Sequence, residues 1–251
     1  MGLLETPAGQ ATLWGCAMSL FSSVVGQLIT GSENDTGYSI DWIPVYRYLL
    51  FTLISTAPNF YWQDFLEKAF PQYIQPLHPK KTDEKEPAPP KFSWRNTLIK
   101  FVLDQSIGAV LNTIAFTTFF NAMRQAMDPC PIFTSPFKAA RYWVSPGAID
   151  FGKVDTAEVW AQSVEQTWPI MKAGWKLWPA VSLINFTMLK TVEMRGIVGG
   201  LAGIIWGIYM SIVARGSWFT RHTSVVQVLE IRTGDDVECT EEPDQDGWYK
   251  P

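Results

Sequence analysis

Residues 11–30, ATLWGCAMSLFSSVVGQLIT, carry no charged side chain over 20 positions. At the rise of an α-helix, about 20 residues match the hydrocarbon core of a bilayer, roughly 30 Å thick. The segment therefore predicts a membrane-spanning helix. A cleaved signal peptide is the alternative, but the preceding residues contain no Lys or Arg, and no convincing small-residue cleavage pattern follows.

Three further apolar runs are long enough to span a membrane. They are 43–62, which is interrupted only by Arg47; 97–123, which is uncharged after Asp104; and 196–214. A shorter run, 177–189, is too short to cross comfortably. The pattern predicts an all-α integral membrane bundle of four transmembrane helices and leaves a fifth span open.

The segments outside these runs are polar. Residues 70–92 combine several prolines with mixed charges, which resists helix formation and predicts a linker. Residues 155–172 predict an amphipathic helix, which we expect to lie at the membrane surface. The chain thus divides into a membrane-embedded helical domain, 1–215, and a soluble, disordered acidic tail, 216–251.

Tryptophan and basic residues indicate how the bundle is placed. The 12 tryptophans recur near the ends of apolar runs, as at Trp42, Trp62 and Trp94, and indole rings favour the membrane interface. The segment between the first two spans has no Lys or Arg, whereas the linker is rich in Lys. We therefore expect the linker and the N-terminus to face the cytosol.

Two of the predicted spans carry small residues every four positions. In the first span the stripe is Ala11, Gly15, Ser19, Ser23 and Gln27, and in the last span it is Gly199, Gly203 and Gly207. Such stripes let another helix approach closely in lipid. We expect the first to face protein and the second to serve helix packing, with a homo-oligomer as one outcome.

Polar residues inside the apolar runs are the candidate functional groups. Lys100 and Asp104 are spaced to share one helix face, so they are expected to pair. With Gln105 and Arg47 they are either a polar entrance to an aqueous path or structural anchors at the membrane interface. Asn185 either bonds a neighbouring helix or contacts a solute.

No pattern of a soluble enzyme is present. The sequence contains no nucleophile elbow, phosphate-binding loop or metal-spaced His/Cys cluster, and its three cysteines, Cys16, Cys130 and Cys239, are scattered. Asp104 is the only well-placed intramembrane carboxylate, whereas a membrane-embedded enzyme needs facing acid and base groups. We expect no enzymatic activity, no cofactor and no metal.

The last third of the chain carries a set of spaced aromatic and polar residues: Trp175, Trp178, Pro179, Asn185, Phe186, Arg195, Trp206, Tyr209 and Ser211. This set resembles the C-terminal motif of the family of Mpv- and PMP-type membrane proteins of peroxisomes and mitochondria. Lys100, Asp104 and Gln105 also resemble the family's lysine, aspartate and glutamine element.

Several positions depart from the family pattern. Ser182 stands where the family has glutamine, Lys190 where it has proline, and Gly207 where it has asparagine. In the second helix Ala57 replaces the usual glycine before Pro58. The chain therefore resembles a divergent, fungal-type member.

The resemblance implies a channel-like protein for small solutes or metabolites in an organelle membrane. An alternative, also drawn from the resemblance, is a scaffold for peroxisome-related biogenesis or sorting. The expected location is the peroxisomal membrane, because the N-terminal segment is not Arg-rich, with the mitochondrial inner membrane as the alternative. The expected partners are the lipid bilayer, small solutes and a second copy of the chain, and no nucleic acid.

Overall fold

The chain is helical almost throughout. The computed structural model describes residues 6–33, 39–74 and 90–213, with side chains over 6–29, 39–74 and 90–207. Within these ranges the structure is all-α apart from one ribbon of two short strands, which confirms the predicted all-α class, while the number of membrane spans stays a prediction. The elements in chain order are α1 Pro7–Glu33, α2 Trp42–Ala69, β1 Tyr73–Ile74, β2 Lys91–Phe92, α3 Trp94–Leu103, η2 Asp104–Gly108, α4 Ala109–Ala126, α5 Pro136–Trp143, η3 Phe151–Lys153, α6 Thr156–Gly174, α7 Trp178–Met188 and α8 Val192–Val213.

The chain forms two compact units, Met1–Tyr209 and Met210–Pro251. Of the second unit, only the backbone of the end of α8 lies within the described residues. The predicted acidic tail, 216–251, lies outside them.

Two helical stretches are long and apolar enough to cross a membrane, Pro7–Ile29 and Trp94–Ala126. They coincide with the predicted spans 11–30 and 97–123. Helices α2 and α8 cover the other two predicted spans, and their crossing of a bilayer stays a prediction. Helix α7 has 11 residues, about 16 Å of helix, which is half of a bilayer core.

These helices present large apolar side chains outward. Leu13 and Trp14 on α1, Ile54 on α2, and Leu98 and Leu111 on the α3–α4 stretch are each more than half exposed. A soluble protein rarely exposes extended apolar surface of this kind. The outer faces are suited to lipid.

The stripe of small residues on α1 faces protein, as predicted. A side chain at Gly15 would lie 3.2 Å from Thr52 and from Thr56 of α2, so the two helices approach closely there. At the other end of the stripe, the Gln27 amide donates to the Asp41 backbone oxygen and accepts from the Asp41 N–H, each at 2.8 Å. Asp41 also caps the start of α2 by accepting from the N–H of Ile43. The pairing of α1 with α2 is therefore fixed at both ends.

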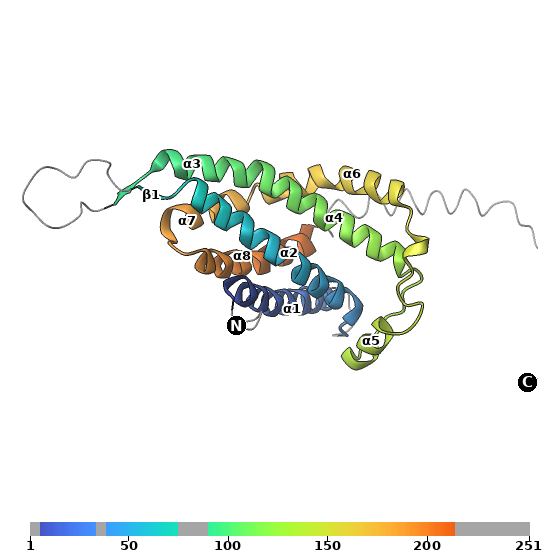
Figure 1. Cartoon of the computed structure of the whole chain (residues 1–251). Helices are drawn as coiled ribbons and strands as arrows, with labels where there is room; N and C mark the ends of the chain where they lie inside the picture. Colours follow the sequence, from blue (N-terminus) through green and yellow to red (C-terminus); the bar gives the residue numbers. More distant parts are fainter. Residues whose placement is uncertain (1–5, 34–38, 75–89, 214–251) are drawn as a thin grey trace, which may run out of the picture. The chain divides into compact units, whose positions relative to one another are not determined.

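A π-helical turn, η2, joins α3 to α4 in one continuous helix (Figure 1). A Cβ at Gly108, the last residue of this turn, would lie 2.7 Å from Nε1 of Trp62 on α2. Because a π turn inserts one residue, it redirects the side chains around it, and such turns recur at functional sites. The turn places Asp104 and Gln105 toward different neighbours, as described below.

The helix predicted over 155–172 is present as α6, and Asp155 caps it by accepting from the N–H groups of Ala157 and Glu158. It runs alongside α4 (Figure 1). Asn121 of α4 donates to Ser163 Oγ at 3.2 Å and to Gln166 Oε1 at 3.1 Å. Helix α6 is thus part of the bundle, and its place at a membrane surface stays a prediction.

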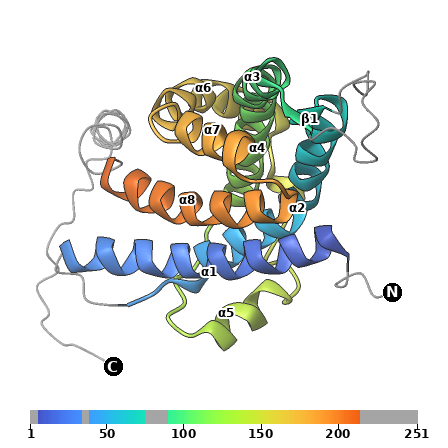
Figure 2. The ribbon, with the colours of Figure 1, turned by 90° about the vertical axis from the view of Figure 1, so that its left-hand side faces the viewer.

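Helix α8 lies beside α1 (Figure 2). A Cβ at Gly207 would lie 2.5 Å from Oγ of Ser22, and one at Gly200 would lie 3.3 Å from Met18. A Cβ at Gly199 or Gly203 would meet nothing within 4 Å. Of the three glycines predicted to serve packing, only Gly207 packs within the described part of this chain.

The ends of the predicted linker are paired. Strands β1 and β2 are antiparallel, with Tyr73 opposite Phe92 and Ile74 opposite Lys91. The ribbon brings the end of α2 next to the start of α3. The middle of the linker, 75–89, lies outside the described residues.

Candidate functional site

A cluster of charged groups is buried where α2, α3 and α8 meet. One carboxylate oxygen, Oε2 of Glu67, lies 2.7 Å from Nζ of Lys100 and 2.7 Å from Nη1 of Arg195. The Lys100 side chain is 0% exposed and that of Arg195 is 1% exposed, whereas that of Glu67 is 26% exposed. Glu67 is therefore the member of this trio that reaches the surface.

The other donors of Arg195 bind the end of α7. Its Nε donates to the backbone oxygens of Asn185 and Leu189, and its Nη2 donates to Leu189 and to Oε1 of Gln72. The last carbonyls of a helix lack partners within the helix and carry partial negative charge. Arg195, in the first turn of α8, thus caps the helix that precedes it.

An aromatic ring completes this charged layer. Phe186 of α7 is 1% exposed. Its ring centroid lies 5.2 Å from Nζ of Lys100 and 5.4 Å from Cζ of Arg195. Cations near a ring at this distance are attracted by its quadrupole. Phe186 therefore helps to hold two cations close to one carboxylate.

A second polar layer is centred on Asp104 of η2. Its carboxylate accepts from Oγ of Ser182 at 2.6 Å, from Nε2 of Gln63 at 2.8 Å and from Nε2 of Gln105 at 3.3 Å. Ser182 is on α7 and Gln63 is on α2. All of these partners are neutral donors.

The two layers stack along three helices. The residue pairs that build them are Gln63 and Glu67 on α2, Lys100 and Asp104 on α3–η2, and Ser182 and Phe186 on α7. Each pair is four residues apart, about one helical turn or 6 Å. We call these six residues together with Arg195 the polar cluster.

The predicted ion pair between Lys100 and Asp104 is wrong. Lys100 pairs with Glu67, which lies opposite it on α2, and Asp104 is occupied by Ser182, Gln63 and Gln105. Lys100 is also buried, so it does not extend outward to the membrane edge. The physical reason is that packing places the Glu67 carboxylate of α2 against the ammonium group, while donors from α2 and α7 occupy the Asp104 carboxylate.

Arg47 lies elsewhere. Its Nε contacts Sδ of Met127 at 3.4 Å, near the start of α2. It is 20 residues from Glu67 on the same helix, roughly 30 Å away. Arg47 therefore does not belong to the polar cluster, and a path that it shares with Lys100 and Asp104 stays a prediction.

The remaining predicted residues lie on or next to α7 and α8. Asn185 contributes its backbone oxygen to Arg195, and its own side-chain oxygen has no hydrogen-bond partner among the described residues. Trp178 begins α7, followed by Pro179, and its ring lies 6.3 Å from that of Trp206. The side chains of Tyr209 and Ser211 lie outside the described residues.

Sequence reasoning missed Glu67, Gln63 and Gln72. Glu67 follows the apolar run 43–62, whereas the candidate residues were chosen inside the apolar runs. A usable signal was present, because Gln63 and Glu67 repeat the four-residue spacing of Lys100 and Asp104. Two helices with matching polar pairs of this kind are expected to face one another.

The environment of Glu67 favours its ionised form. Burial acts to raise the pKa of this carboxyl, but hydrogen bonds from Lys100, the Gln72 N–H and Arg195 outweigh burial and hold the pKa below its ordinary value. Glu67 lies beyond the apolar run 43–62. It is therefore a carboxylate at neutral pH.

An all-α fold with apolar outer faces and ion pairs buried between helices is typical of an integral membrane protein. The model of the Mpv17 / PMP22 family matches residues 152–211, a range that includes Ser182, Phe186 and Arg195 of the polar cluster. With the relatives described next, this match supports membership of the Mpv17 / PMP22 family. Membership of this family implies a membrane protein of an organelle.

Three curated relatives support this assignment. PXMP2/4 family protein 3 of Dictyostelium discoideum is 26% identical over 212 residues, 84% of this chain and 86% of the relative. Protein SYM1 of Yarrowia lipolytica is 22% identical over 39% of this chain and 47% of its own length. Protein SYM1 of Gibberella zeae is 36% identical over 21% of this chain and 30% of its own length. No solved structure matches the chain significantly.

Proposed function

We propose that this protein is a channel-like, multi-pass protein that lets small hydrophilic solutes cross an organelle membrane along the polar cluster. The observation that carries the proposal is the stack of two polar layers between the helices. The first layer is Glu67, Lys100 and Arg195, and the second is Gln63, Asp104 and Ser182. Charged groups within a membrane bundle are costly and recur where ions or solutes pass.

The described conformation corresponds to a closed path. Both cations of the first layer are held by Glu67 and Phe186, and Asp104 is held by three donors. A solute that enters from the exposed side of Glu67 would exchange its own hydrogen bonds for those of the cluster. Opening therefore requires Glu67 to release at least one cation.

The charge of the layers favours small anions at the entrance. The first layer holds two cations and one carboxylate, and the second layer holds one carboxylate. The excess positive charge therefore lies in the first layer, which reaches the surface through Glu67. A small anion is the solute that would be attracted there.

The proposed topology has four spans, which lie in α1, in residues 43–62 of α2, in the α3–α4 stretch and in α8, with α7 as a half-length helix. The linker and the N-terminus face the cytosol, and the membrane is that of the peroxisome, with the mitochondrial inner membrane as the alternative. We propose no catalytic activity, because the partners of Asp104 are Gln63, Ser182 and Gln105, which are neither acids nor bases.

The test is conductance of the purified protein in planar bilayers, together with release of small anions and neutral solutes from liposomes. Wild-type protein is expected to conduct and to release anions faster than neutral solutes of the same size. If protein that elutes as a single folded species in size-exclusion chromatography shows neither conductance nor solute release, the channel proposal is refuted. Two-colour microscopy with carbonate extraction of the same membranes assigns the organelle and tests membrane integration.

A scaffold function is the second candidate, and the outer face of α8 favours it. Gly196, Gly199 and Gly203 all face open space in the described part of the chain, so another helix has room to approach them. The Gly199→Leu/Gly203→Leu variant tests this without disturbing Gly207, which packs on Ser22. Loss of oligomers on blue-native gels would support a scaffold, and unchanged migration would count against it.

A further inference from the structure

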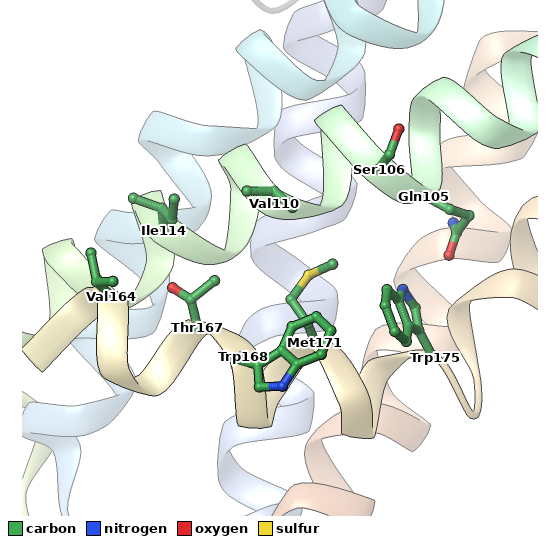
Figure 3. Close-up of a pocket in the computed structure, with 9 residues that line it drawn as sticks. All are labelled: Gln105, Ser106, Val110, Ile114, Val164, Thr167, Trp168, Met171 and Trp175. Carbon is green, nitrogen blue, oxygen red and sulfur yellow. The ribbon is translucent and has the colours of Figure 1, made fainter.

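A separate apolar pocket lies between α4 and α6, on the far side of the π turn from Asp104. It has a volume of about 380 Å³, which is within the range of small-molecule sites. One wall follows η2 and α4 through Ser106, Val110 and Ile114, and the other follows α6 from Val164 to Trp175, the residue after its end (Figure 3). The shorter wall covers nine residues, so the pocket is an elongated slot on the order of 12 Å long.

The slot opens on the outer surface of the helices. Val164, Trp168 and Trp175 are about half exposed, so the side of the slot is open along α6. The position of Trp168 is fixed by an edge-on contact with Trp175, centroids 5.5 Å apart, and by Lys172, whose Nζ lies 5.1 Å from the ring. In a membrane-embedded bundle such an opening gives access from lipid. The occupant therefore has an apolar body.

One polar atom at the end of the slot has no partner. Gln105 lines the slot close to Trp175 (Figure 3). Its Nε2 donates to Asp104, but its Oε1 is buried and accepts no hydrogen bond from the described residues. An amide oxygen left unpaired in an apolar place is costly, so it marks a position where a donor is missing.

The two hydroxyl groups of the slot are already engaged. Ser106 Oγ donates to the Val102 backbone oxygen, and Thr167 Oγ1 donates to that of Ser163. A buried water needs two to four polar partners and would be poorly held beside Gln105. A ligand that brings one donor on an apolar body satisfies Gln105 and fills the slot.

We propose that this slot binds a membrane lipid with an apolar body and a single hydroxyl, which donates its hydrogen bond to Oε1 of Gln105. A sterol and a long-chain alcohol share this chemistry, and they differ in whether the body is rigid or flexible. The site does not depend on conduction through the polar cluster, since it faces α6 and the cluster faces α2 and α7.

The experiment uses the purified full chain and two photoactivatable probes, a sterol and a hexadecanol, each as the free alcohol and as its methyl ether. We expect saturable labelling, mapped by mass spectrometry to α4 and α6, and labelling by the alcohol at a roughly three- to tenfold lower concentration than by its ether. Labelling by the sterol alone assigns a rigid body, and labelling by hexadecanol assigns a flexible one. Failure of both probes to label α4 and α6 overturns the proposal.

Three variants locate the site. Val110→Trp fills the slot and should abolish saturable labelling, whereas Leu111→Trp places the same residue on the neighbouring outer face of α4 and should leave it unchanged. The Gln105→Leu protein should bind the alcohol and the ether equally, because it lacks the Oε1 acceptor for the hydroxyl group. Equal labelling of the Val110→Trp and Leu111→Trp proteins, or a hydroxyl preference that survives Gln105→Leu, overturns the proposal. The comparison of alcohol with ether needs no substitution, so it holds even if a variant fails to fold.

Discussion

Glu67 of α2 lies 2.7 Å from Lys100 of α3, and the two residues are 33 positions apart in the chain. The Lys100 side chain is fully buried, whereas that of Glu67 is partly exposed. The counter-ion of Lys100 therefore comes from another helix, α2. Glu67 also holds Arg195 of α8. One carboxylate oxygen thus ties three helices together.

Removal of that carboxylate is expected to destabilise the fold strongly. Glu67→Ala leaves two buried cations without their counter-ion, a change that costs about 3–5 kcal/mol in comparable cases. Glu67→Gln keeps the shape and should cost less. Thermal unfolding in detergent, followed by tryptophan fluorescence, measures both variants against wild type. Wild-type stability of Glu67→Ala would contradict the ion cluster.

The pair should show coupling in a double-mutant cycle. Lys100→Met relieves one of the two cations that Glu67→Gln leaves unpaired, so the double variant should lose less stability than the sum of the two single variants. The expected coupling is on the order of 1–3 kcal/mol. Lys68→Met with Glu67→Gln is the control, because Lys68 pairs with Asp64 at the surface. Its coupling should be near zero.

Acid should weaken the cluster only at low pH. The pKa of Glu67 is held below its ordinary value of 4.5, so ionised Glu67 stabilises the folded state at all pH values above that value. This stability is lost as the pH falls through the lowered pKa. The difference in unfolding temperature between wild type and Glu67→Gln should therefore be constant from pH 7 to about pH 5 and should shrink below it. A difference that is independent of pH down to pH 3 would show that the charge of Glu67 has no role.

Glycines of α8 should differ sharply in their tolerance of side chains. A Cβ at Gly207 would lie 2.5 Å from Oγ of Ser22, whereas one at Gly199 would meet nothing. Gly207→Leu is therefore expected to cost about 1–3 kcal/mol through overpacking of α8 on α1. Gly199→Leu should be neutral or slightly stabilising for the monomer, because leucine is the better helix former. Equal unfolding temperatures of the two variants would contradict the described packing of α8.

The sequence alone predicts the helices well and their partners poorly. The apolar run 97–123 identifies a long helix because its length and lack of charge are local properties. It does not reveal the π turn at Asp104, which accompanies the close approach of Trp62 to Gly108. The pairing of Lys100 was mispredicted because it also depends on contacts between helices. Spacing on one helix defines which residues share a face, but the opposing residue, Glu67, is set by the way α2 packs against α3.

The resemblance to a family identified part of the site without giving its geometry. Phe186 and Arg195 were named as motif residues, and the structure gives each a physical role, as a ring beside two cations and as the cap of α7. Ser182, a departure from the family pattern, donates to Asp104 at 2.6 Å. A position that departs from the family pattern thus takes part in the polar cluster.

The proposed path predicts that substitution of Asp104 changes the solute preference and that substitution of Arg47 does not. Asp104→Asn removes the charge of the second layer but keeps the size of the side chain and one oxygen, which can still accept from either Gln63 or Ser182, so the fold should persist while the preference for anions increases. Arg47→Gln removes a cation about 30 Å from Glu67 along α2 and should leave the solute preference unchanged. Reversal potentials in planar bilayers under a salt gradient measure the preference. A shift with Arg47→Gln and none with Asp104→Asn would place the path away from the polar cluster, because a charge affects permeation only where the solute passes close to it.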